Sequence, residues 1–234
     1  MNTSLFDLLT DLINNGDSKN PAFVYLLDDY AKYHYVMVVL GGISVIALTI
    51  FTGSQLNRLR RGSSFLIHVK TVSGKASLYL GAFSSFLALV LGLIVVGNLG
   101  NAVNPRPGFK NSLGMLGNPL AGTKSALLQQ TYADWIRSES SSLPHYISKI
   151  SDERISWQMP KAIICFVLFA LFLYLSKIVW TPLVSGSLDS QKPHMYRSFA
   201  LGILLSFICA LLFIMTIANA QGSIAPVSLS LFFS

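Results

Sequence analysis

The chain has 234 residues, of which 52% are hydrophobic and 12% are charged, and its formal net charge is +7. Soluble domains carry about 25% charged residues, so this composition excludes an ordinary soluble protein and indicates a membrane protein. Cys165 and Cys209 each lie inside an apolar run, which predicts two buried thiols and no disulfide framework.

The first 16 residues predict an amphipathic helix and not a signal peptide. Four leucines recur at helical spacing: Leu5, Leu8, Leu9 and Leu12. Ser4 is placed to cap this helix, whereas Asp7 and Asp11 interrupt the apolar stretch that a signal peptide needs. We expect the helix either to lie on the outer membrane surface or a partner, or to pack on the chain's own helices.

Four apolar stretches are long enough to cross a bilayer, which takes about 20 residues of helix. They lie at 33–52, 77–97, 160–180 and 198–219, and none has a charged residue at mid-depth. Asn20 and Pro21 open a helix that is expected to continue through the first stretch, and Trp157 and Trp180 bracket the third as interfacial tryptophans do. The predicted fold is an all-α membrane protein with four transmembrane helices, an N-terminal amphipathic helix and a small helical extracytoplasmic cap.

The loop between the first two stretches is strongly basic and contains no acid. It holds Arg58, Arg60, Arg61, Lys70 and Lys75. The positive-inside bias places this loop in the cytoplasm, and both termini and the long middle loop outside. Such clusters also attract anionic lipid headgroups, and we expect no nucleic-acid partner. The outer loop has no glycosylation sequon, which favours a bacterial or organellar membrane, and we expect the bacterial cytoplasmic membrane.

This topology divides the chain into five segments. They are an extracytoplasmic helical extension (1–32), a transmembrane hairpin (33–97), the extracytoplasmic loop or cap (98–159), a second hairpin (160–219) and an apolar extracytoplasmic tail (220–234). In the tail, Val227, Leu229 and Leu231 alternate with serines, which is the period of a half-buried strand. We expect the tail either to add a strand to a neighbouring subunit or to lie along the headgroup layer.

Small residues recur on three of the four predicted spans, at spacings that let helix backbones approach closely. They are Gly41, Gly42 and Ala47 in the first span, Ser84, Ala88 and Gly92 in the second, and Ser198, Gly202, Ser206 and Ala210 in the fourth. Packing within the chain is one interpretation, and assembly of a homo-oligomer is the other. The third span carries Phe166, Phe169 and Phe172 instead, so we expect it at the periphery, against lipid or a partner subunit.

The long outer loop changes character near its middle. Residues 97–122 are rich in Gly, Asn and Pro and predict irregular coil. Thr123 then opens a predicted helix with one apolar stripe, formed by Leu128, Tyr132, Trp135 and Ile136. This stripe is either part of the core of an outer cap or a partner-binding surface.

The sequence contains no catalytic, metal-binding or cofactor motif of recognised spacing. We therefore expect no enzyme and no cofactor, and hypothesise a non-catalytic subunit of a larger membrane assembly, with lipids and other membrane subunits as partners. The alternative is a homo-oligomeric pore with Asp28 and Asp29 at its mouth, although Asp28 is also spaced to pair with Lys32. A third interpretation is a membrane enzyme that acts on lipid or envelope substrates through the outer loop.

Overall fold

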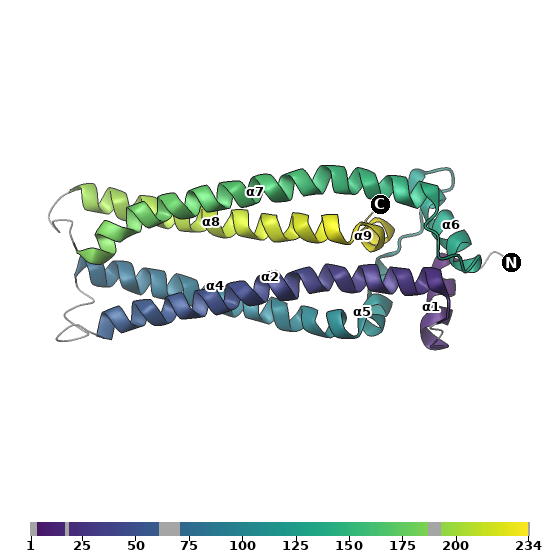
Figure 1. The fold of residues 1–234 in the computed structure, drawn as a ribbon, viewed down its shortest axis with the longest axis horizontal. Helices are drawn as coiled ribbons and strands as arrows, with labels where there is room; N and C mark the ends of the chain where they lie inside the picture. Colours follow the sequence, from purple (N-terminus) through teal and green to yellow (C-terminus); the bar gives the residue numbers. More distant parts are fainter. Residues whose placement is uncertain (1–3, 17–18, 61–70, 187–192, 234) are drawn as a thin grey trace. The chain divides into compact units, whose positions relative to one another are not determined.

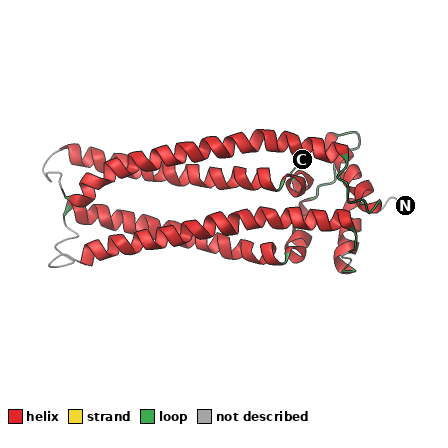
Figure 2. Cartoon of the chain, in the orientation of Figure 1, coloured by secondary structure: helices red, strands yellow, loops and turns green. Residues whose placement is uncertain are grey.

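The computed structural model describes residues 4–16, 19–60, 71–186 and 193–233, which are almost entirely helical and contain no strand (Figure 2). The helices of this described part are labelled in Figure 1. They are α1 (Leu5–Asn14), α2 (Pro21–Arg60), α4 (Val72–Val103), α5 (Pro105–Ser112), the 3-10 helix η1 (Leu113–Met115), α6 (Lys124–Arg137), α7 (His145–Ser185), α8 (Pro193–Ile224) and α9 (Pro226–Phe232).

Helices α2, α4, α7 and α8 are each long and apolar enough to cross a membrane. A helix is the expected form of such segments because lipid offers no partner for backbone polar groups, and a helix satisfies them internally. As predicted, α2 begins at Pro21, where the Asn20 side chain accepts a hydrogen bond from Phe23 N–H at 3.0 Å. The chain is thus an all-α membrane protein with four long apolar helices.

The chain forms two compact units, which we describe separately. The cap unit comprises residues 1–38, 96–161 and 218–234. The span unit comprises residues 39–95 and 162–217. Each of the four long helices contributes one part of its length to each unit.

The cap unit has a hydrophobic core of its own, to which α1, α2, α5, α6, α7 and α9 contribute. Leu5 and Leu9 of α1 are in this core, and Ser4 caps α1 by accepting the N–H of Asp7 at 3.1 Å. The predicted N-terminal amphipathic helix is therefore confirmed. Of the two placements that the sequence left open, α1 takes the one on the chain's own helices.

The prediction of irregular coil over residues 97–122 was wrong for much of its length. Helix α4 continues to Val103, and α5 and η1 follow. Pro105 fixes a helical φ at the first position of α5, and Phe109 and Leu113, four residues apart, are buried in the cap core. A Cβ at Gly108 would overlap the Asn101 side chain, which would then have to move. Packing therefore overrides the weak helix propensity of the glycines.

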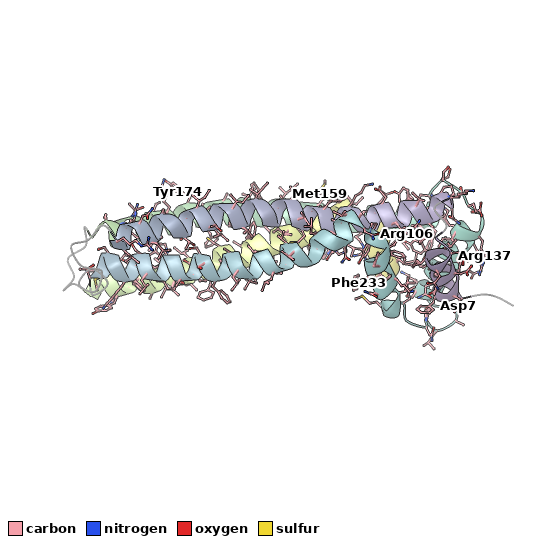
Figure 3. All side chains as sticks on the ribbon, turned by 90° about the horizontal axis from the view of Figure 1, so that it is seen from below. Asp7, Arg106, Arg137, Met159, Tyr174 and Phe233 are labelled. Atoms are coloured by element: carbon pink, nitrogen blue, oxygen red, sulfur yellow. The ribbon has the colours of Figure 1, made fainter. Side chains whose placement is uncertain are left out.

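The span unit has a small core where α4, α7 and α8 meet. Its buried members are Ala76, Trp180, Leu183 and Met195. Trp180 is only 5% exposed because it packs in this core, whereas Trp157 is 66% exposed. The interfacial depth of both tryptophans stays a prediction. In the most apolar stretch of α7, 11% of the residues are buried, against 17–28% in the other three long helices. This low burial agrees with the predicted peripheral position of α7. Tyr174 projects outward from this helix (Figure 3).

Candidate functional site: the residues that hold the C-terminal helix

Three side chains from three helices hold the short helix α9 in the cap unit. The carboxylate of Asp29 on α2 accepts the N–H of Ser228 at 2.6 Å. The hydroxyl of Tyr132 on α6 donates to the carbonyl of Val227 at 2.8 Å. Arg154 on α7 donates to Ser230 Oγ and to the carbonyl oxygen of Phe233, both at 3.1 Å. We call Asp29, Tyr132 and Arg154 the α9 clasp.

The charges of the clasp match the dipole of α9. An acid lies at the helix N-terminus and a base at its C-terminus, which is the favourable arrangement. Asp29 precedes the apolar span at 33–52 and is 4% exposed. Burial raises the pKa of its carboxyl group, and the hydrogen bond from Ser228 opposes that rise. Burial also raises the pKa of Tyr132, so the phenol keeps its proton and remains a donor.

The sequence of α9 explains why the predicted strand was wrong. Val227 and Leu231 are four residues apart, a spacing that puts both side chains on one face of either a helix or a strand. In the structure they enter the cap core from a helix. Ser228 and Ser230 are 2% and 0% exposed, and such small side chains let the helix lie close to its neighbours. Ser230 Oγ also donates to the carbonyl of Pro226 at 2.7 Å, which satisfies the buried hydroxyl inside the helix.

The two adjacent acids proposed for a pore mouth have different environments. Asp28 is exposed and pairs with Lys32 at 2.6 Å, which confirms the predicted i, i+4 pair. Asp29 is buried and faces Ser228 within the same chain. Consecutive residues of a helix point about 100° apart, so burying one side of α2 separates the roles of the two carboxylates.

The four residues of the predicted apolar stripe are not available as a partner surface. Leu128, Tyr132, Trp135 and Ile136 are 0–3% exposed and belong to the cap core. The stripe was correctly identified as one face of a helix, but this chain covers it with α1, α2 and α9, so the partner-surface interpretation was wrong.

Exposed apolar side chains of the cap unit lie beside that stripe instead. Met115, Leu120 and Leu127 are 58%, 79% and 52% exposed. We call these three residues the cap patch. A pocket of about 270 Å³ adjoins it, lined by Met115, Gly117, Asn118, Pro119, Ser125, Gln129, Leu231 and Phe232. The patch thus lies next to the C-terminal end of α9.

The structure brings two of the predicted small-residue sets into helix contacts. A Cβ at Gly202 would lie 2.7 Å from the Trp180 ring, and Ser206 Oγ accepts the indole N–H of Trp180 at 3.3 Å. Ser84 and Thr52 exchange a hydrogen bond at 2.8 Å between α4 and α2.

The remaining small residues make fewer close contacts with neighbouring helices. Gly42 and Gly92 border open space, because a Cβ at either position would have no neighbour within 4 Å. Among the others, Gly41 is buried, Ala88, Ser198 and Ala210 are half-buried, and Ala47 is exposed. These residues therefore do not form one continuous close contact within the chain.

The basic residues of the first predicted loop extend from helix ends. Arg58 and Arg60 are exposed at the end of α2, and Lys75 is exposed in the first turn of α4. Arg61 and Lys70 lie outside the described residues.

No family model, curated protein or solved structure matches this chain. Within the described residues, no three His, Cys, Asp or Glu side chains gather in a way that could hold a metal ion. The fold defines the class of protein, which is an all-α membrane protein with four long apolar helices.

Proposed function

We propose that the protein is a non-catalytic subunit of a larger membrane assembly and that the cap patch contacts another membrane subunit. The observation that carries the proposal is the exposure of Met115, Leu120 and Leu127, which lie in the cap unit outside the apolar spans. Single exposed apolar residues are common. Here three large ones fall within 13 residues, and Met115 also lines the adjoining pocket. Exposed apolar side chains that gather in this way support the proposal of an interaction surface.

The segment that carries the patch is held in place before any partner binds. The Gln129 side chain donates to the carbonyl of Gly117 at 3.0 Å, and the Thr123 hydroxyl donates to the carbonyl of Leu120 at 2.8 Å. A surface that is ordered in advance loses less conformational entropy on binding. This geometry therefore favours a specific protein contact over a loose one.

The charge distribution supports an orientation with the cap and both termini on the extracytoplasmic side of a bacterial cytoplasmic membrane. By sequence, the span unit contains eight of the 17 basic residues and only one of the ten acids. The cap unit contains the other nine bases and nine acids and carries no formal excess. Basic residues beside membrane spans remain on the cytoplasmic side.

Site-specific photo-crosslinking in native membranes tests the partner contact. A benzophenone amino acid at Leu120 or Leu127 is expected to give a discrete heavier product that contains a second membrane protein. Gln130 is an exposed polar position on α6 and serves as the matched control, from which no such product is expected.

The composition of the product decides between the hypotheses. A product made only of two copies of this chain would support the homo-oligomeric pore instead. Equal products from Leu120 and Gln130, or none from either patch position, would contradict the proposed surface.

A further inference from the structure

His34 connects α2 to α4 within the cap unit. Its side chain is buried, with 8% of its surface exposed. The ring nitrogen Nδ1 lies 2.6 Å from Oδ1 of Asn98 on α4. Because an amide oxygen can only accept a hydrogen bond, Nδ1 is the donor and carries the proton of the neutral ring. The second nitrogen, Nε2, then holds a lone pair.

The Nε2 atom of His34 is buried and has no hydrogen-bond partner among the described residues. Aromatic rings pack against the imidazole on this helix instead. Tyr30 and Tyr33 meet it edge-on, with ring centroids 4.5 Å and 5.2 Å away. A second proton on the ring would place an N–H donor and a positive charge where no described group accepts either. The closed site therefore suits the neutral ring only.

No acid is among the contacts of His34 with the described residues. Asn98 on α4 is uncharged, and the two tyrosines remain neutral below about pH 9. Tyr30 connects the cluster to α5 and α9, again through groups that do not titrate, which are Phe109, Ser112 and Phe232. The surroundings therefore supply no negative charge to stabilise a protonated imidazole.

The charged groups of the neighbouring elements do not produce the same response to acid. Asp29 on α2 faces Ser228 of α9, and burial raises the pKa of its carboxyl group. The closed unit therefore takes up a proton on Asp29 more readily than an opened one, so acid strengthens the closed form through this group. Arg106 and Lys110 of α5 keep their charge between about pH 5 and pH 8. Only His34 is placed to weaken the closed form in acid.

We propose that His34 and Asn98 form an acid-sensitive latch between α2 and α4. The neutral ring holds the two helices together, and Nε2 binds a proton only when the latch opens and water reaches the ring. Acid therefore favours the opened form by mass action. The latch does not depend on the proposed function. With the cap unit on the extracytoplasmic side, this contact would respond to the pH outside the cytoplasm.

Hydrogen–deuterium exchange of the purified full-length chain in lipid nanodiscs measures the latch. Exchange of residues 98–103, at the end of α4, is followed at pH 7.5 and at pH 5.5 and divided by the rate of an unstructured peptide at the same pH. A histidine in water has a pKa of about 6.5, so the opened form gains about tenfold in population between these values. The protection factor of residues 98–103 is therefore expected to fall about tenfold. Residues 86–93 of the same helix are expected to show no change, because the opening is local.

Two variants assign the effect to one histidine. His34→Asn places an amide nitrogen near the position of Nδ1 and cannot titrate, so its protection is expected to be the same at both pH values. His145 is the other described histidine of the cap unit and is exposed. His145→Asn is the matched control and is expected to retain the tenfold fall.

The comparison between the two pH values decides the outcome, so a lower baseline stability of His34→Asn does not obscure it. Equal protection of the unmodified chain at both values would overturn the proposal. A tenfold fall that persists in His34→Asn, is lost in His145→Asn, or appears equally in residues 86–93 would overturn it as well.

Discussion

Removal of the Asp29 carboxylate is expected to release α9 from the cap unit. In Asp29→Ala, the buried N–H of Ser228 loses the acceptor that lies 2.6 Å away. A buried donor without a partner costs about 1 to 3 kcal/mol. A loss of about 2 kcal/mol raises the equilibrium for local opening of α9 by about 30-fold. The rest of the cap core remains packed, so the effect is local.

A thiol at position 227 reports this opening. Val227 is 2% exposed and its side chain is similar in size to cysteine, so Val227→Cys disturbs the core little. Cys165 and Cys209 are first replaced by alanine. When reclosing is faster than labelling, the maleimide reaction rate follows the opening equilibrium. The rate is therefore expected to rise about 30-fold in Asp29→Ala, and less in Asp29→Asn, which keeps an acceptor oxygen.

The neighbouring acid is the matched control. The Asp28 side chain is 61% exposed and pairs only with Lys32 among the described ion pairs, so Asp28→Ala is expected to leave the labelling rate nearly unchanged. Equal acceleration by Asp28→Ala and Asp29→Ala would refute the clasp, as would no acceleration by either. Such results would mean that position 227 opens for reasons unrelated to the Asp29 hydrogen bond.

Two further predictions concern the span unit and the orientation. Gly202→Ala places a Cβ 2.7 Å from the Trp180 ring and is expected to lower the free energy of unfolding, measured by thermal unfolding, by about 1 to 3 kcal/mol. Gly42→Ala is the control: its Cβ would meet no atom within 4 Å, so little effect is expected. Equal changes in the two variants would contradict the contact between Gly202 and Trp180. A single cysteine at exposed Ser141 is expected to react with an impermeant maleimide on intact cells, whereas one at exposed Asn57 reacts only after permeabilisation. The opposite pattern would reverse the orientation.

The transmembrane helices were predictable because their cause is local. A run without charges and of sufficient length allows few structures in lipid, and Asn20 followed by Pro21 marks the start of α2. The small residues Gly202 and Ser206 were also recognised as a place of close approach. Their partner, Trp180, was not, because spacing on one helix indicates a smooth face but does not identify the residue that fills it.

The clasp was not predictable by the same means because its contacts are distant in sequence. Asp29 and Ser228 are 199 positions apart, and Arg154 and Ser230 are 76 apart. Within the tail, alternating serines matched a strand over only five residues, too few to exclude a helix. The local signal for the helix was Pro226 in the first position, followed by Val227 and Leu231 at i, i+4.

The distribution of charge implies that the proposed contact of the cap patch is not electrostatic in origin. The whole formal excess of +7 belongs to the span unit, whereas the cap unit has equal numbers of acids and bases. Salt screens charges, because the Debye length falls from about 10 Å at 0.1 M to about 3 Å at 1 M. Contact through Met115, Leu120 and Leu127 is apolar and should persist at the higher salt concentration. Loss of the Leu120 crosslink at 1 M salt would therefore contradict an apolar contact.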